Sequence, residues 1–238
     1  MGIELEAGEI ERLGRYLALL MAANQVMNLT AIRTVEDAVE KHLLDSLTLL
    51  PVLAEAQAGA GDADGEKAAL RVLDVGSGGG LPGLVLAICR PDAAFTLLDS
   101  TEKKCGFLRH VSREIGLENV TVWHDRAEVA GQDKSSKREK FDVVIARAVG
   151  RLASLLEITV PFARVGGLCA LTKGQKAEEE LAEAKGALRL LHAAHAGTVE
   201  TPTGRIVVIE KLRKTPGAYP REIGEPKRNP LGVESDIR

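Results

Sequence analysis

A glycine-rich stretch followed by an acid is the most informative pattern in the chain. In residues 73–83, LDVGSGGGLPG, Gly76, Gly78 and Gly80 follow one short apolar run and precede another. Glycine lets a ligand approach the backbone, and the N–H groups that open a following helix point toward that ligand. Asp99 ends the next apolar run, at the spacing where a carboxylate accepts hydrogen bonds from ribose hydroxyls. The pattern predicts a nucleoside-binding site, and a tight turn with a solvated Asp99 is the alternative.

The identity of the nucleoside cofactor depends on the acid that precedes the glycines. Gly78, Gly80 and Gly83 also satisfy the G-x-G-x-x-G pattern, so a nicotinamide cofactor and an NAD-dependent oxidoreductase are an alternative. Asp74 begins the run D-V-G-S-G-G-G, where an acid can contact the amino group of a methionine moiety through water but repels a pyrophosphate. This arrangement resembles the first motif of the class I methyltransferase superfamily. We therefore expect S-adenosylmethionine to be the cofactor.

Further polar residues follow the third and fourth predicted strands, at the edge where a doubly wound sheet binds its ligand. The loop 124–128, HDRAE, could hold the edge of an adenine or be a solvated acidic turn. Arg147 ends the fourth strand, where a guanidinium could clamp a carboxylate, contact RNA phosphate or lie on an ordinary surface. Both places are therefore candidate extensions of the cofactor site.

The end of the chain is locally basic although the whole chain carries a formal net charge of −3. Residues 211–230 contain six Lys or Arg and two Glu, with four prolines that favour an extended chain. Aromatic rings can stack on unpaired bases, and clustered cations neutralise phosphates. These residues are either an RNA contact or a solvated face. The predicted RNA-binding residues are Arg213, Lys214, Tyr219, Arg221, Lys227 and Arg228.

Alternating strands and helices must position these residues. The predicted fold is therefore α/β, a mostly parallel, doubly wound sheet preceded by a helical extension. Strands are predicted at 71–75, 95–99, 119–123, 141–149, 168–173 and 205–212. Helices are predicted through Ile10, Leu13, Leu17 and Leu20, from Thr34 to about Pro51, from 81 to 89, through Phe107 to Ile115 with Gly116 as its cap, and at 152–165 and 177–192. Residues 55–67 are interpreted as a loose connector.

The composition limits the class of protein. With 238 residues and 45% hydrophobic residues, the chain suits one compact domain, with an extension over 1–54, a cofactor domain over 68–212 and a basic tail over 213–238. Its three cysteines are far apart, which excludes a disulfide framework and a CxxC zinc site. We expect no signal peptide and no membrane span, and hence a cytoplasmic protein.

Two histidine pairs have spacings that could carry chemistry. His192 and His195 are expected to share a helix face without ligand partners, so no metal site is predicted. His42 and Asp45 also share a face and could form a catalytic pair, but a hydrogen-bonded core histidine is favoured.

Taken together, seven segments of the chain resemble the bacterial RsmG family, also called GidB. They run in the same order over nearly the whole chain: MNLTAI (27–32), KHLLDSLTLL (41–50), VLDVGSGGGLPGLVLAI (72–88), LLDSTEKKCGFLRHV (97–111), VIARAV (144–149), LTKG (171–174) and YPREIGEPKRNPL (219–231). The resemblance implies a Rossmann-like class I methyltransferase fold with a seven-stranded sheet. It also implies methylation of N7 of a guanine, position 527 in the customary bacterial numbering, in 16S ribosomal RNA of the small subunit.

The resemblance also places functional residues. It implies cofactor contacts at Gly76, Leu81, Asp99, Ala127, Glu128 and Arg147, beside the glycines and Asp74 identified above. The tail departs from the family, in which Y-P-R-K-x-G is common: Glu222 stands where the lysine is expected, and Glu225 adds a second acid.

Guanine N7 carries a lone pair and no proton, so it can attack a sulfonium methyl directly and no general base is predicted. Catalysis would come from holding the reactants in line. The partner would be 16S ribosomal RNA or an assembling small subunit, and the protein is expected to act as a monomer. The sequence also leaves open a non-catalytic RNA-binding module on the same fold and a small-molecule methyltransferase.

Overall fold

The computed structural model describes residues 3–59, 69–147 and 150–233. The chain divides into two compact units, Met1–His124 and Asp125–Arg238, and each is described by itself. The boundaries predicted from the sequence, at 54, 68 and 212, stay a prediction.

The first unit combines a helical N-terminal part with three parallel strands. The strands lie in the order β3-β2-β1, with Val75 of β1 beside Leu98 of β2. All three strands begin within one residue of their predicted starts. The elements are α1 (Ala7–Met27), α2 (Val35–Ala38), the π-helix η1 (Val39–Leu44), α3 (Asp45–Leu47), α4 (Leu50–Gly59), β1 (Arg71–Val75), α5 (Gly83–Cys89), β2 (Ala94–Asp99), α6 (Glu102–Glu114) and β3 (Val120–His124).

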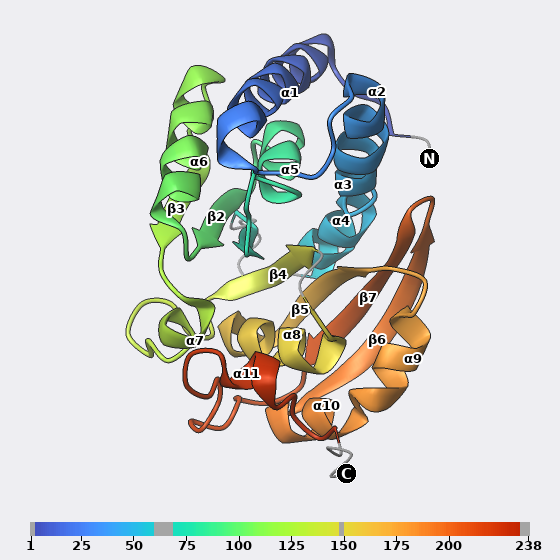
Figure 1. Ribbon diagram of the computed structural model, residues 1–238. Helices are drawn as coiled ribbons and strands as arrows, with labels where there is room; N and C mark the ends of the chain where they lie inside the picture. Colours follow the sequence, from blue (N-terminus) through green and yellow to red (C-terminus); the bar gives the residue numbers. More distant parts are fainter. Residues whose placement is uncertain (1–2, 60–68, 148–149, 234–238) are drawn as a thin grey trace. The chain divides into compact units, whose positions relative to one another are not determined.

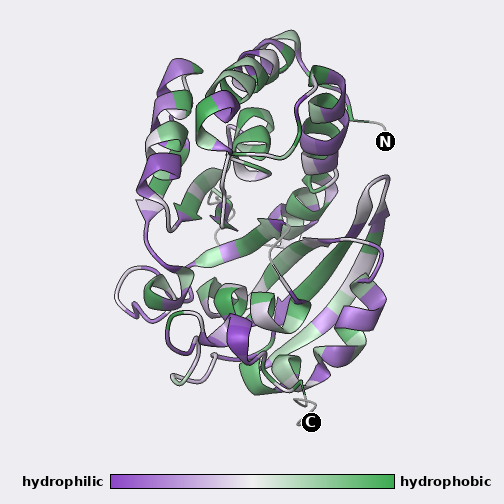
Figure 2. Cartoon of the chain, in the orientation of Figure 1, coloured by the Kyte–Doolittle hydropathy of each residue, from purple (hydrophilic) through white to green (hydrophobic). Residues whose placement is uncertain are grey.

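An apolar core joins α1 to α5 and α6 in this unit. Leu13, Leu17 and Leu20 of α1 are buried as predicted, whereas Ile10 is 58% exposed and does not belong to the core. Helix α1 lies beside α5 and α6 in Figure 1, and Figure 2 shows apolar residues along the sides that face each other. Gly116 follows α6 with a φ of +68°, so the predicted cap is confirmed in position.

The prediction around Pro51 was wrong. Thr34 does cap α2, accepting a hydrogen bond from the backbone of Asp37, but Pro51 lies in the first turn of a new helix. Proline is tolerated there because the first helical N–H groups have no partner to lose. Residues 55–59 belong to α4 instead of a loose connector, since their alanines favour helix. The rest of the predicted connector, 60–67, lies outside the described residues.

The second unit holds four strands in the order β4-β5-β7-β6. Strand β4 pairs with β5 in parallel, and the other two pairings are antiparallel. Strand β4 is buried on both faces, as expected for the interior of a parallel sheet. The elements are α7 (Ala127–Ala130), β4 (Phe141–Arg147), α8 (Leu152–Thr159), the 3-10 helix η2 (Val160–Phe162), β5 (Ala163–Lys173), α9 (Ala177–Glu183), α10 (Lys185–Leu191), β6 (Ala193–Thr201), β7 (Gly204–Lys211) and α11 (Glu225–Arg228).

Strand β6 corrects the prediction about His192 and His195. His192 ends α10 in a left-handed conformation and His195 lies on β6, so the two histidines share no helix face. The strand escaped notice because its small residues give no clear apolar alternation and a bulge at His195–Gly197 interrupts its pairing. The predicted helix 152–165 ends at Phe162, where β5 begins, and the helix 177–192 breaks into two pieces at Ala184.

Across the described residues there are seven strands, five of them parallel to a neighbour, with helices between them. This confirms the predicted fold class of a mostly parallel, Rossmann-like α/β protein. Among the residues that the structure describes, no helix is long and apolar enough to cross a membrane.

Candidate functional site

The glycine loop of the first unit is shaped by its own backbone. Gly76, Gly78 and Gly80 have φ values of +78°, +57° and +95°, which side-chain-bearing residues rarely adopt. The N–H groups of Gly76 and Ser77 both donate to the carbonyl oxygen of Leu98, at 2.8 and 3.1 Å. The loop is thereby fixed to the end of β2, beside the predicted ribose-binding acid.

Asp99 holds this loop from the other side. Its Oδ2 accepts the N–H of Gly78 at 2.9 Å, and its Oδ1 accepts the N–H of Thr101 at 2.8 Å. Each carboxylate oxygen can accept a second hydrogen bond, so this arrangement leaves Asp99 able to accept from ribose hydroxyls as well. The structure therefore brings Asp99 and the glycines together as predicted from their spacing.

Asp74 lies beneath the loop at the start of α5. It is buried, and its Oδ2 accepts the N–H of Gly83 at 3.0 Å. A Cβ on Gly83 would lie 2.6 Å from the same oxygen, so only glycine lets the carboxylate approach this closely. Asp74 thus caps the first turn of α5, and its contact with a methionine moiety remains a prediction.

Two glycines of the loop differ in what surrounds them. A Cβ on Gly80 would collide with Leu84 at 2.4 Å, so this glycine is required by packing. A Cβ on Gly78 would meet only the carbonyl oxygen of Gly76, at 3.8 Å. The loop therefore has one face filled by the core and one open face at Gly78. An open backbone face beside a carboxylate fits a nucleoside.

A residue that sequence reasoning missed supports the loop from the helical extension. The hydroxyl of Tyr16, which is fully buried in α1, donates to the carbonyl oxygen of Gly79 at 3.0 Å. Leu20 and Leu29 lie against the same glycine. Leu29 lies in the segment 27–32, which the family resemblance marked without giving it a role, whereas nothing in the sequence marked Tyr16.

The pair His42 and Asp45 is part of this buried extension. His42 Nε2 lies 2.7 Å from the hydroxyl of Thr30, and Nδ1 lies 3.2 Å from the carbonyl oxygen of Lys41. Both His42 and Asp45 are buried. The favoured interpretation, a hydrogen-bonded core histidine, is therefore confirmed.

In the second unit the remaining predicted cofactor residues follow strands. Ala127 and Glu128 open α7, and Arg147 is the last, half-buried residue of β4, in register with Thr172 of β5. Glu128 forms an ion pair with Arg126 at 2.8 Å and accepts the N–H of Gly224 at 3.0 Å. Burial alone would raise the pKa of Glu128, but these hydrogen bonds outweigh it and hold the pKa below its usual value.

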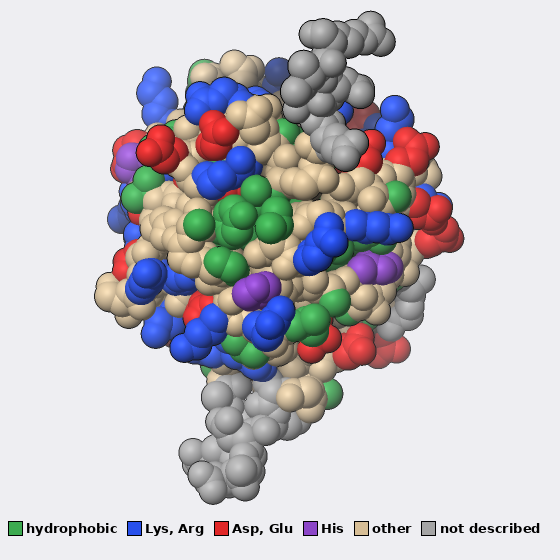
Figure 3. Space-filling view, turned by 90° about the horizontal axis from the view of Figure 1, so that it is seen from below, with side chains coloured by type: hydrophobic (Ala, Val, Ile, Leu, Met, Phe, Trp, Pro, Cys, Tyr) green, Lys and Arg blue, Asp and Glu red, His purple; other side chains and the backbone are tan. Residues whose placement is uncertain are grey.

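Some of the predicted RNA-binding residues form ion pairs with acids of the same unit, and others do not. Arg221 forms a two-pronged ion pair with the fully buried Glu157, and Arg228 pairs with Glu225. Tyr219 is half-buried. Within the described residues, the exposed Arg213, Lys214 and Lys227 form no ion pair. Figure 3 shows that Lys and Arg form several separate groups on one face, with apolar and neutral surface between them.

Residues 215–229, the C-terminal segment, are docked by side chains that the sequence did not reveal. Arg138 is buried and donates to four carbonyl oxygens, those of Gly131, Tyr219, Thr215 and Pro216, at 2.7 to 3.1 Å. Gln132 donates to the carbonyl oxygens of Gly217 and Pro220. The prediction of an extended segment was therefore incomplete, because these donors hold it against its own unit.

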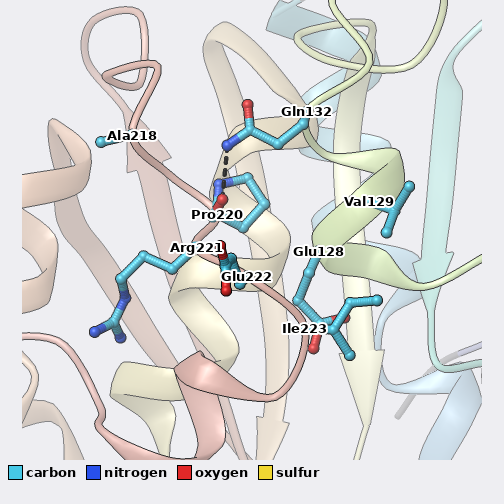
Figure 4. A pocket seen from close by; sticks show the side chains of 8 residues that line it. All are labelled: Glu128, Val129, Gln132, Ala218, Pro220, Arg221, Glu222 and Ile223. Atoms are coloured by element: carbon cyan, nitrogen blue, oxygen red, sulfur yellow. Dashed lines mark hydrogen bonds between the residues drawn. The ribbon is translucent and has the colours of Figure 1, made fainter.

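A cavity of about 740 Å³ lies between α7 with the turn that follows it and the C-terminal segment. In Figure 4 Val129 comes from α7, Gln132 from the turn that follows it, and Pro220 to Ile223 from the C-terminal segment, with the bond from Gln132 to Pro220 drawn as a dashed line. Among the residues that the structure describes, no group of His, Cys, Asp and Glu could hold a metal ion.

The sequence is similar to one family of methyltransferases. Residues 9–206 match the family model described as rRNA small subunit methyltransferase G. A ribosomal RNA small subunit methyltransferase G of Sorangium cellulosum is 51% identical over 220 residues, which are 92% of this chain and 87% of that protein. The protein of that name from Brevibacillus brevis is 40% identical over 237 residues, covering 97% and 94%.

Solved structures support the same fold. A methyltransferase from Geobacter sulfurreducens superposes with a TM-score of 0.57 at 14% identity, over 89% of this chain and 94% of that one. A SAM-dependent methyltransferase from Aquifex aeolicus gives 0.51 at 17% identity, over 73% and 92%. At these identities the likeness concerns the fold alone.

Proposed function

Because the chain belongs to the rRNA small subunit methyltransferase G family, we propose that it transfers a methyl group from S-adenosylmethionine to N7 of a guanine in small-subunit ribosomal RNA. The observation that carries this proposal is the family match over residues 9–206 together with the open backbone face at Gly78 beside Asp99. A nicotinamide-dependent reaction finds no support in these relatives.

The residues of the glycine loop and Asp99 in the first unit fit the cofactor. In the first unit Asp99 would accept the ribose hydroxyls, and the backbone at Gly76, Gly78 and Leu81 would lie against the nucleoside. In the second unit the family resemblance assigns contacts to Ala127, Glu128 and Arg147. The bound cofactor supplies an electrophilic methyl group on a positively charged sulfur.

The chain then has to position the target guanine, and it needs no side chain that acts as a general base. Guanine N7 has a lone pair and no proton, so nothing has to be deprotonated before attack. Rate enhancement would come from holding the two reactants in line, which is the work of rigid loops such as the one fixed by Asp99 and Tyr16.

RNA binding would use those cations of the second unit that form no ion pair within the described residues. Arg213, Lys214 and Lys227 are exposed and can neutralise phosphates, whereas the guanidinium of Arg221 is already held by Glu157. The proposed substrate is 16S ribosomal RNA or an assembling small subunit in the cytoplasm, and the proposed active species is a single chain.

The test is methyl transfer from labelled S-adenosylmethionine to small-subunit RNA from a strain that lacks this modification. Label should enter the RNA and map to one N7-methylguanosine. If neither naked RNA nor small-subunit particles of any assembly state accept label, the proposal fails. Cofactor binding without transfer in all of these substrates would instead favour a non-catalytic RNA-binding protein.

A further inference from the structure

An apolar groove lies between α1 and the continuous run of α2, η1 and α3. It has a volume of about 510 Å³, and each described residue that lines it is apolar or a glycine. Both walls belong to the first unit and are drawn in blue in Figure 1. Four large apolar side chains of the lining are 39 to 58% exposed, namely Ile10, Val35, Val39 and Leu44. Large exposed apolar side chains seldom gather in one hollow unless a partner covers them, so the groove is a candidate docking site.

The border of this groove is acidic. Glu11, Glu36 and Glu40 each follow a lining residue directly, and all three are exposed. Within the described residues, no cation and no hydrogen-bond donor reaches their carboxylates. Glu4 and Glu6, which are also exposed, lie on either side of a further lining residue. The groove therefore offers apolar walls between carboxylates that have no partner among the described residues.

The cations of the same helices do not balance these acids. Arg15 pairs with Glu114 of α6 at 3.2 Å, and Lys41 pairs with Asp37 of its own helix. Arg12 is exposed and forms no ion pair within the described residues, but it stands alone against the three acids of the border. The border consequently has an excess of negative charge.

This combination of charge and apolar surface disfavours several occupants. RNA, a fatty acid and an anionic lipid surface carry the same charge as the border and would be repelled by it. A second copy of the chain in a two-fold contact would place the same acids opposite each other. The chain's own segments outside the described residues are no better suited: AGDADGEKA (60–68) and ESDIR (234–238) are acidic and contain one large apolar residue between them.

We propose that this groove binds an amphipathic helix of a partner protein, in which Lys or Arg residues lie on both sides of an apolar stripe. Grooves lined by apolar side chains bind such helices through anchors at i, i+3, i+4 and i+7. The stripe would pack against Val39 and Leu44, and the flanking cations would pair with Glu11, Glu36 and Glu40. The inference goes beyond the proposed function and does not depend on methyl transfer.

The first test uses two synthetic peptides of about 18 residues that share one leucine stripe. One peptide carries lysine on both flanks of the stripe, and the other carries glutamate. In fluorescence anisotropy the lysine peptide should bind, and the glutamate peptide should bind at least about tenfold more weakly. Added salt should narrow this difference because it screens the charges. No saturable binding of the lysine peptide, or equal binding of the two peptides, would overturn the proposal.

The second test locates the binding site with the same lysine peptide. Val39→Ser and Leu44→Ser should each weaken it about tenfold, because each removes an apolar contact from the groove. Val26→Ser is the matched control, since Val26 is an 82% exposed valine of α1 outside the lining. Unchanged affinity in the two groove variants, or an equal loss in all three, would contradict the proposed site.

The third test reverses the charge of the border. The double variant Glu36→Lys, Glu40→Lys should weaken the lysine peptide and strengthen the glutamate peptide. Glu179→Lys with Glu183→Lys is the matched control, because these two acids are also exposed and four residues apart, on α9. A gain for the glutamate peptide cannot come from damage to the fold. If the preference between the peptides stays the same, the acids do not recognise the partner.

The fourth test identifies the natural occupant with a photo-cross-linking amino acid at position 39 of the full chain, in cells. The cross-linked peptide should show, by mass spectrometry, apolar residues at helical spacing with Lys or Arg beside them. Cross-links to RNA, to lipid or to an acidic segment would overturn the proposal. A dimer in sedimentation experiments that Leu44→Ser dissociates would make the groove an interface between copies, and the proposal would be wrong.

Discussion

The glycine loop of the first unit and the C-terminal segment of the second are positioned in different ways. The loop takes its shape from three glycines with positive φ and from an acid 21 residues from the amide it binds. The C-terminal segment takes its place from Gln132 and Arg138, which reach carbonyl oxygens 77 to 88 residues away. One region is specified by its backbone and the other by distant side chains.

Because of this difference, the two regions should respond to substitutions in different ways. A loop made of glycines is disturbed by any added side chain, whereas a segment held by buried cations is disturbed by any lost charge. Buried donors that satisfy several carbonyls leave all of those carbonyls unpaired when they are removed. Substitutions in the second unit should therefore cost more stability, and substitutions in the loop should cost more ligand affinity for the same stability.

The largest effect is expected from Arg138→Ala. The change removes the donors of four hydrogen bonds and leaves buried carbonyl oxygens of the C-terminal segment without partners. Urea unfolding should show a loss of about 4 kcal/mol. Limited proteolysis should then cut within residues 215–229, which the unaltered protein protects. Arg189→Ala, at an exposed position of α10, serves as the control, and equal losses in both variants would show that Arg138 does not clamp the segment.

The next effect concerns the ion pair between Glu139 and the fully buried Lys211, whose atoms lie 3.0 Å apart. Burial alone would raise the pKa of Glu139, but the hydrogen bond and charge of Lys211 outweigh it and hold the pKa below 4.5. Burial also lowers the pKa of Lys211, despite its partner. Glu139→Gln leaves this ammonium without its counterion and should cost about 3 kcal/mol at neutral pH.

The pH dependence of this pair follows from the depressed pKa of Glu139. Its stabilising contribution is fully present above pH 4.5, the ordinary value of the group, and is lost as the pH falls through the lower value in the folded protein. The difference in unfolding free energy between the unaltered protein and Glu139→Gln should therefore shrink below pH 4.5. A difference that stays constant down to about pH 3 would mean that the carboxylate contributes nothing through its charge.

The same contrast explains which features could be predicted from the sequence. Strand β1, the glycine loop and Asp99 are signalled by neighbouring residues, because positive φ, strand ends and spacing are local properties. The core histidine, His42, could be inferred from its apolar neighbours in a helical pattern. These signals do not require knowledge of any residue far along the chain.

The missed features depend on partners distant in the sequence. Nothing beside Arg138 indicates that it meets Tyr219, and nothing beside Glu157 indicates Arg221, 64 residues further on. Strand β6 is stabilised by its pairing with β7, although its own residues are a poor strand pattern. Basic residues in a proline-rich segment consequently suggested an RNA contact or a solvated face, whereas the charge of Arg221 neutralises the buried Glu157.

A matched pair of glycine substitutions tests whether the open face of the glycine loop binds the cofactor. Gly78→Ala and Gly116→Ala both place alanine at a positive φ, +57° and +68°, with no clashing neighbour. Each should cost about 1 kcal/mol of stability. Only Gly78→Ala should weaken binding of S-adenosylhomocysteine, by roughly tenfold in calorimetry, since its methyl group enters the open face of the loop. Equal affinities in the two variants would place the cofactor elsewhere.

The smallest effect should come from Tyr16→Phe, which tests whether the glycine loop keeps its position without the hydrogen bond from α1. The substitution removes the hydroxyl that donates to the carbonyl of Gly79 and keeps the buried ring. One lost hydrogen bond should cost about 1 kcal/mol of stability. If α1 also positions the loop, the dissociation constant of S-adenosylhomocysteine should rise about threefold to fivefold.

Ser112→Ala is the matched control for this substitution, because it removes a buried hydroxyl that donates to Leu108 within α6, away from the loop. The two variants should lose similar stability, since each loses one buried hydrogen bond. If Tyr16→Phe also leaves the cofactor affinity unchanged, α1 supports the fold without positioning the loop. The loop would then be shaped by its own backbone and Asp99 alone, whereas the C-terminal segment is held by the side chains of Gln132 and Arg138.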